Sequence, residues 1–269
     1  MRLRNIFTSV VGVALAASLV ACGGSKQETS STSAAPASPG AAGPGQKVDE
    51  ATAGNVTGVV SLDGTAPKNE PIKMNADPVC MKANKDPQFQ ETYEVKDGKL
   101  ANVFVYVKDG LGNYVFDTPT TPVTIDQKNC RYHPHVFGIR VGEPLEIVNS
   151  DGTLHNIHAM PKTNAEFNTG QPIQGMKTMH TFDKKEVMVP FKCDVHGWMN
   201  AYVGVMDNPY YAVTDADGKF ELKSLPPGTY TIEAWQEKLG PMTQTVTLGP
   251  KDSKEVNFTF KAGASTTNN

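Results

Sequence analysis

The chain alternates apolar and polar residues over short runs, and most runs end in residues that favour turns. Such short strands, separated by closely spaced turn signals, predict an all-β sandwich. No stretch shows a helical period with caps, although a short helix between residues 161 and 175 stays open. The clearest strand candidates are residues 102–107, 137–141, 145–148, 186–191 and 201–206.

The last section of the chain has a pattern of its own. Residues 211–220 form a predicted hairpin with an Asp-Gly turn, and residues 225–234 pass from a Pro-Pro-Gly turn into an alternating strand. The motif Thr-Asp-x-Asp-Gly-x-Phe followed by Leu-Pro-Pro-Gly-Thr-Tyr resembles carboxypeptidase regulatory-like domains, which are transthyretin-like sandwiches with a carbohydrate-binding-like fold. Residues 55–60 resemble the opening strand of the same module. The pattern leaves open whether the intervening domain is inserted into this small sandwich.

The beginning of the chain resembles a secretory signal. Arg2 and Arg4 form a short positive region, and residues 6–19 are apolar but too few for a membrane-spanning helix. The Leu-Val-Ala-Cys run that ends at Cys22 resembles a bacterial lipobox, in which the cysteine is lipidated after cleavage; an ordinary signal peptide is the alternative. The resemblance implies an extracytoplasmic, lipid-anchored protein, in the periplasm at the outer membrane if the host is Gram-negative.

A segment of low complexity follows. It consists mainly of Ser, Ala, Thr, Gly and Pro, which bury too little surface to offset the entropy of ordering, so a disordered, flexible tether is expected. Removal of the signal peptide would take away Arg2 and Arg4 and change the formal net charge from −3 to −5. Positive and negative residues are interspersed along the chain, which indicates no nucleic-acid partner. The expected organisation is a signal peptide at 1–21, the tether at 22–54, N-terminal strands at 55–94, a first sandwich at 95–207, the regulatory-like sandwich at 208–262 and a tail at 263–269.

The number of cysteines indicates which of them is available as a free thiol. The four cysteines are Cys22, Cys80, Cys130 and Cys193. If Cys22 carries lipid, three remain in an oxidising compartment, and the odd thiol needs an explanation. A Cys80–Cys130 disulfide would leave Cys193 as the unpaired thiol. The alternative is a second metal site built from Cys130, His133 and His135, although the proline between the two histidines favours the start of a strand.

The unpaired cysteine lies in a loop with the residue types of a metal site. The loop reads Cys-x2-His-x2-Met and contains Cys193, His196 and Met199, while His155 begins a neighbouring strand candidate. Singly, a cysteine or a methionine is usually a core residue. Together these four form the His2Cys set with a weak axial Met that proteins use for blue-copper electron transfer. Asn156 is expected to hydrogen-bond the Cys193 sulfur and tie the two ligand segments together.

These residues also carry a family resemblance. Leu-His-Asn-Ile-His at 154–158, Gly-Met-Lys at 175–177 and the loop at 191–199 resemble the cupredoxins, most closely those of the amicyanin and pseudoazurin type. The resemblance covers roughly residues 95–207 and implies a Greek-key sandwich holding one type 1 copper. The implied roles are equatorial ligands at His155, Cys193 and His196, an axial ligand at Met199, and an electron-exit patch at Gly197 and Trp198 around an exposed edge of His196.

The combined features predict a membrane-tethered, copper-binding electron carrier rather than an enzyme, because a closed four-ligand centre leaves no position for a substrate. Expected partners are redox proteins such as a cytochrome c or a periplasmic oxidoreductase, the membrane through the lipid, and a glycan or protein ligand for the C-terminal module. Copper storage or delivery, or a cell-surface binding module with a structural metal, remain as alternatives. His158 should point away from His155, and His180 should be solvated.

Overall fold

A computed structural model describes residues 45–263. The predicted signal peptide, the lipidation site Cys22, most of the predicted tether and the tail from residue 264 lie outside the described residues. Strands dominate the part that is described, so the all-β prediction is confirmed. No helix within residues 45–263 is long and apolar enough to cross a membrane.

One sandwich is built from both ends of the described chain. Its first sheet has the strand order β17-β1-β5-β4, with β20 and β21 also paired to β1, and its second sheet has the order β16-β6-β18-β19. One face of β1 is buried at every second residue, as expected for a strand that covers a core. The strands are β1 (Gly54–Asp63), β4 (Val95–Lys96), β5 (Lys99–Leu100), β6 (Phe104–Asp109), β16 (Tyr211–Val213), β17 (Lys219–Leu225), β18 (Gly228–Gln236), β19 (Gly240–Leu248), β20 (Ser253–Glu255) and β21 (Phe258–Lys261).

The other sandwich lies between these two parts in the sequence. One sheet has the order β13-β10-β7-β8, and the facing sheet has the order β12-β11-β14-β15-β9. A continuous core of aliphatic and aromatic side chains fills the space between the sheets, and it includes Cys193 and Met199. The strands are β7 (Val123–Lys128), β8 (Arg131–His133), β9 (Val136–Arg140), β10 (Leu145–Asn149), β11 (His155–Ala159), β12 (Phe167–Gln171), β13 (Lys177–His180), β14 (Glu186–Lys192) and β15 (Asn200–Met206).

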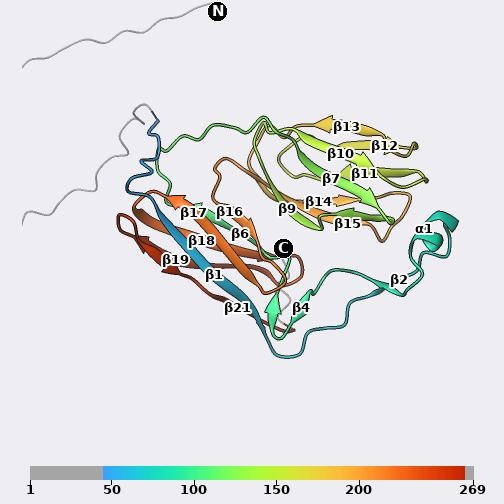
Figure 1. The fold of residues 1–269 in the computed structure, drawn as a ribbon, viewed down its shortest axis with the longest axis horizontal. Helices are drawn as coiled ribbons and strands as arrows, with labels where there is room; N and C mark the ends of the chain where they lie inside the picture. The colour runs from blue at the N-terminus through green and yellow to red at the C-terminus, as the bar shows by residue number, and fades with distance from the viewer. Residues whose placement is uncertain (1–44, 264–269) are drawn as a thin grey trace, which may run out of the picture. The chain divides into compact units, whose positions relative to one another are not determined.

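Strand pairing shows that the sandwich formed by β7 to β15 is inserted into the sandwich that contains β1 and β6. The blue strand β1 lies among the orange and red strands in Figure 1, and β6 pairs with β16 and β18. The strand expected at 102–107 therefore belongs to the sandwich that contains β1, whereas the sequence pattern placed it in the sandwich expected at 95–207, which is the inserted one. Its first four residues are all buried, and such a run does not indicate which sheet a strand joins.

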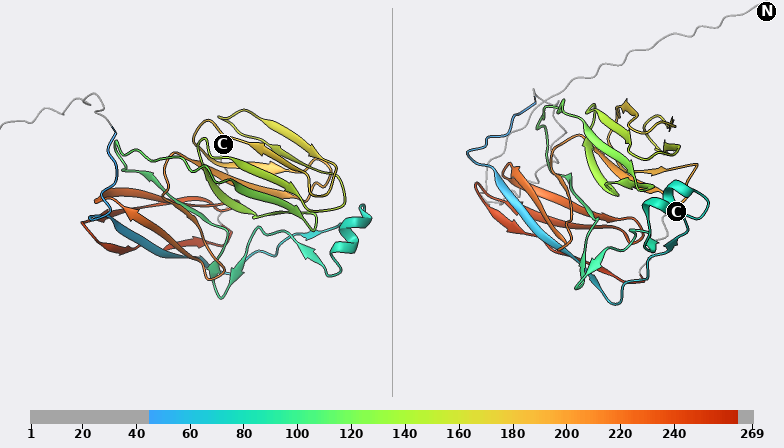
Figure 2. Two further views of the ribbon diagram at one scale, coloured as in Figure 1. Left: turned by 45° about the horizontal axis from the view of Figure 1, so that its top comes forward. Right: turned by 45° about the vertical axis from the view of Figure 1, so that its right-hand side comes forward.

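Between β1 and β4 the chain leaves the sheets of both sandwiches in a segment that we call the arm (residues 70–90). A ribbon of β2 (Pro71–Ile72) and β3 (Gln88–Phe89) leads to helix α1 (Pro78–Ala83) at its tip. Asp77 caps α1 because its side chain accepts hydrogen bonds from the amides of Val79 and Cys80. Figures 1 and 2 show the arm reaching the end of the inserted sandwich. The segment 161–175 contains the strand β12 (Phe167–Gln171) and no helix.

The two sandwiches share a third, smaller core. It is formed by Phe104 and Tyr106 of β6 with Val136, Met188 and Met206 of the inserted sandwich. Glycines in the paired strands β9 and β15 let aromatic rings approach closely. A Cβ at Gly204 would lie 2.3 Å from the ring of Phe104, and one at Gly138 would lie 2.3 Å from the ring of Tyr211.

The start of the described chain contacts the folded part before β1 begins. Gln46 forms a parallel bridge with Tyr114, and its amide donates to the carbonyl of Asn113 at 3.0 Å. Lys47 lies 2.6 Å from Asp117. The sequence pattern extended the flexible tether to residue 54, but residues 46–47 already have partners in the fold. Composition did not show this, because the bridge uses backbone groups that every residue carries.

Candidate metal centre

Strand register brings the candidate ligands together. Strands β11 and β14 are antiparallel, with His158 opposite Lys192, so the first residue of β11 lies beside the loop that follows β14. This places His155 next to Cys193 and His196. The loop is closed by backbone bonds from the Met199 amide to the His196 carbonyl at 2.9 Å and from the Cys193 amide to the Met199 carbonyl at 3.2 Å. A short loop between two paired strands thus holds three of the four predicted ligands.

Three donor atoms converge in the interior. The Nδ1 atoms of His155 and His196 lie 2.9 Å apart, and the Cys193 sulfur is 3.9 Å from the His196 Nδ1. One donor atom from each of these residues lies within 4.8 Å of the others. The three residues are 0%, 3% and 2% exposed, in the order His155, His196 and Cys193. This is a compact, water-excluded set of two imidazoles and one thiol.

A carboxylate lies behind each imidazole. The Nε2 of His155 is 2.9 Å from Asp151, and the Nε2 of His196 is 3.0 Å from Asp77. A hydrogen bond at Nε2 selects the tautomer in which Nδ1 carries the lone pair, so both rings are oriented with their ligating nitrogen toward the site. Sequence reasoning missed both carboxylates. Asp151 precedes His155 by four residues, but Asp77 is 119 residues from His196.

The electrostatics of the pocket favour a thiolate. Burial raises the pKa of Cys193, but hydrogen bonds from His155 and from the backbone amides of Asn156 and His196 outweigh it, so the pKa lies below its ordinary value. Burial lowers the pKa of His155, yet Asp151 and the Cys193 sulfur raise it to about 9. The pKa of His196 is lowered, chiefly by burial. The lowered pKa of Cys193 makes its thiol easier to deprotonate when a cation binds beside it.

Asn156 connects the two ligand segments. Its side-chain oxygen accepts a hydrogen bond from the Asp194 amide at 2.8 Å and lies 3.3 Å from the Cys193 sulfur. Its side-chain nitrogen donates to Asn168 at 2.7 Å. The side chain of Met199 is 1% exposed and packs in the same core as Cys193. Asn156 therefore contacts the site directly, and Met199 is joined to Cys193 and His196 through its backbone.

The expected exposed edge of His196 is absent from the structure. His196 is 3% exposed, because the arm covers it with Asp77 and with Cys80, whose sulfur is 3.7 Å from the His196 Nε2. Gly197 is exposed, but Trp198 is half-buried and its indole N–H donates to the Cys130 carbonyl at 2.9 Å. The ring of Trp198 stays 5.0 Å from that of His196. The family resemblance covers roughly residues 95–207, so it gave no sign that the arm at residues 70–90 covers His196.

The remaining cysteines and histidines have other partners. Cys80 and Cys130 form a disulfide, which leaves Cys193 as the free thiol of the described residues. The alternative site around Cys130 thereby lacks a thiolate, and His135 instead pairs with Glu237 at 2.7 Å. His158 contacts Glu166 and Asp194 near the surface.

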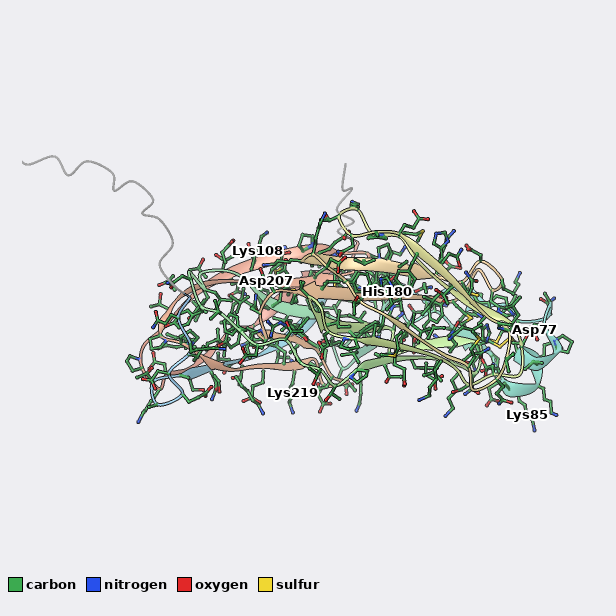
Figure 3. All side chains as sticks on the ribbon, turned by 90° about the horizontal axis from the view of Figure 1, so that it is seen from above. Asp77, Lys85, Lys108, His180, Asp207 and Lys219 are labelled. Atoms are coloured by element: carbon green, nitrogen blue, oxygen red, sulfur yellow. A yellow bond between two sulfur atoms is a disulfide. The ribbon has the colours of Figure 1, made fainter. Side chains whose placement is uncertain are left out.

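His180 is less exposed than the sequence indicated. The sequence predicted a solvated side chain, but its ring is half-buried and stacks on Phe167 at a centroid distance of 3.7 Å. Burial also lowers its pKa. Figure 3 labels His180 far from Asp77, which lies at the end of the molecule that carries the arm.

The C-terminal part can be assigned by comparison with known families. Residues 199–261 match the carboxypeptidase regulatory-like domain. The match begins at the end of the ligand loop and continues through β21, so it covers β15 of the inserted sandwich and the strands β16 to β21 of the discontinuous one. A sequence comparison with curated proteins finds no match.

Structural comparison finds neighbours that are cupredoxins. A Cu-containing nitrite reductase from Thermus scotoductus SA-01 is 23% identical over 33% of this chain, with a TM-score of 0.31, and the chain spans 23% of that protein's length. The Cu(I) form of an amicyanin mutant is 18% identical over 34% of this chain and 87% of its own, with a TM-score of 0.29. A purple cupredoxin from Nitrosopumilus maritimus is 22% identical over 31% of this chain and 99% of its own, with a TM-score of 0.28.

Proposed function

We propose that the protein is a copper-binding electron carrier with one type 1 centre. The observation that supports this most is the convergence of two imidazole nitrogens and one thiol sulfur at a buried position. A trigonal His2Cys set with a weak axial Met is the arrangement used by blue-copper centres. Imidazole and thiolate donors suit both oxidation states of copper.

The residues present fit a copper ion. Each imidazole has its Nε2 bonded to a carboxylate, which leaves Nδ1 for the metal, and the pKa of the thiol is lowered. His155, Cys193 and His196 would hold the ion, with Met199 as the weak axial ligand. The bound metal would supply a one-electron couple that the protein side chains do not offer.

The chain itself contributes a fixed geometry and the exclusion of water. Asp151 and Asp77 hold the two rings from behind, and Asn156 fixes the loop that carries Cys193. Ligands that are held from outside move little when the charge at the centre changes, which keeps the barrier to electron transfer low. A centre whose four ligands all come from the protein would offer no open position to a substrate, so the proposed role is electron transfer rather than catalysis.

Location and partners complete the proposal. Lipidation at Cys22 would tether the centre outside the cytoplasm, at the outer membrane if the host is Gram-negative. Trp198, whose ring lies 5.0 Å from that of His196, together with the exposed Gly197, would offer the route by which electrons leave. A cytochrome c or a periplasmic oxidoreductase is the kind of partner expected, and the regulatory-like module would bind a glycan or a protein.

The test begins with titration of the metal-free full chain with Cu(II). We expect an intense blue thiolate-to-copper absorption that saturates at one equivalent, and reversible bleaching by a one-electron donor. Cys193→Ser should abolish the band, and His155→Ala should open the site and change the band. His133→Ala is the matched control, because His133 is exposed and outside the site, and it should leave the band unchanged.

The other outcomes separate the alternatives. Stoichiometric copper binding without the blue band would contradict a type 1 centre and favour storage or delivery. Binding of a glycan that is independent of copper would favour a cell-surface binding module in which the metal is structural.

A further inference from the structure

The arm covers His196, although the arm connects two strands of the other sandwich. It leaves β1 and returns to β4, both in the regulatory-like sandwich, and its tip lies over the ligand loop of the inserted one. Met74 and Cys80 of the arm are 7% and 0% exposed and pack in the core of the inserted sandwich. The arm is therefore part of the wall of the metal pocket.

Several bonds fix the tip of the arm in place. The Cys80–Cys130 disulfide attaches α1 to the turn between β7 and β8. Asn84 at the end of α1 donates to the carbonyl of Asn129 at 3.0 Å. At the base of the arm, Gln90 donates to the carbonyl of Trp198 at 3.0 Å. The cover is thus fastened on both sides of His196 to the loops that surround the site.

Asp77 is the one carboxylate of the arm that faces the site. The same oxygen, Oδ2, lies 3.0 Å from the His196 Nε2 and accepts the hydroxyl of Thr153 at 2.7 Å, while Oδ1 accepts the amides that begin α1. Oδ1 therefore accepts hydrogen bonds from the helix, and Oδ2 holds His196. The ring of His196 cannot turn outward without breaking this contact.

We infer that Asp77 is a positioning residue for His196 and that the disulfide-fastened arm limits the exchange of copper with the solvent. This inference rests on the proposed copper centre. Of the two histidine ligands, His155 lies on strand β11, whereas His196 lies on the loop after β14 and is the one that the arm covers. A metal would therefore leave or enter most easily where the ring of His196 swings away. The contact with Asp77 and the cover by α1 oppose that movement.

The experiment measures copper release from the Cu(I)-loaded full chain into an excess of the chelator bicinchoninate. We compare wild type with Asp77→Asn, which keeps the shape of the side chain but removes its charge, and with the double variant Cys80→Ser, Cys130→Ser. Removal of such a carboxylate partner typically changes metal affinity by about 10–100-fold, so we expect release from Asp77→Asn to be faster by about tenfold or more. The double variant should also release copper faster.

Asp86→Asn is the matched control, because Asp86 also lies in the arm but its side chain is exposed. Its release rate should equal that of wild type. Equal rates for Asp77→Asn and wild type, with both proteins folded by circular dichroism, would overturn the inference. The blue band of the Cu(II) form is recorded for each variant. If wild type lacks the band, the type 1 centre is refuted. The role of the arm is still tested in that case, by the ratio of the release rates of Asp77→Asn and wild type.

Discussion

Three of the four predicted ligands, His155, His196 and Cys193, are each held by a neighbouring side chain outside the predicted ligand set. Asp151 and Asp77 orient the two imidazoles, and Asn156 joins the strand that carries His155 to the loop that carries Cys193. The geometry therefore depends as much on these three side chains as on the ligands. Their loss should be measurable without any metal.

Asn156→Ala tests this dependence. The substitution removes the oxygen that accepts the Asp194 amide and leaves a partly buried donor without its partner, which costs about 1–3 kcal/mol. We expect the free energy of unfolding of the metal-free protein, measured in urea, to fall by that amount. The control is Asn168→Ala, at an exposed side chain that shares the same network, which should change stability by about 0.5 kcal/mol or less. Equal effects of the two variants would contradict the role given to Asn156.

At the residue scale, the sequence indicated the ligands and Asn156, but not the two carboxylates that lie behind the imidazoles. Cys193, His196 and Met199 share one short loop, and their residue types and spacing are specific enough to be read directly. Asp77 has no such signal, because its contact with His196 exists only after two distant segments have folded together. The burial of His196 follows from the same contact.

At the scale of elements, alternation predicted strands well and their partners poorly. The runs at 137–141, 145–148, 186–191 and 201–206 correspond to β9, β10, β14 and β15. Strand β6 was also expected, but its sheet was not, since hydrogen-bond pairing in a sheet depends on backbone groups and not on a local pattern. The two-residue strands of the arm have no period to detect.

Gly204→Ala tests how β15 packs against β6. A Cβ at this position would lie 2.3 Å from the Phe104 ring, so the ring or the strand must move. Overpacking of this kind costs about 1–3 kcal/mol, and we expect the midpoint of urea unfolding to fall accordingly. Gly170→Ala is the control, because no atom lies within 4 Å of its Cβ position. A Gly204→Ala protein as stable as the control would mean that the two sandwiches do not pack through this strand.

At the scale of the whole molecule, the described part is one sandwich inserted into another. The opening strand at 55–60 indicated that the regulatory-like module has a distant first part, but only the pairing of β1 with β17, β20 and β21 decides the topology. His135 of the inserted sandwich forms a buried pair with Glu237, the residue that follows β18 of the other sandwich.

This pair predicts a pH dependence of stability. Burial lowers the pKa of His135, but Glu237 and, more weakly, Glu91 outweigh it, so the pKa lies above its ordinary value. A group with a raised folded pKa contributes fully below its unfolded pKa of about 6.5, and the contribution is lost as the pH rises through the folded value. Glu237→Gln should cost about 3 kcal/mol at pH 6 and less at pH 9, as measured by urea unfolding. A cost that does not change with pH would contradict a charged pair.

The central claim is that Cys193 is a thiolate ligand of a single copper. The most direct measurement is the electron paramagnetic resonance spectrum of the full chain loaded with one equivalent of Cu(II). A type 1 centre predicts a narrow hyperfine splitting, because part of the unpaired electron lies on the sulfur, and Cys193→Ser should widen it. A wide splitting in the wild-type protein, unchanged by that substitution, would show that copper binds without the thiolate and would contradict the proposed type 1 centre.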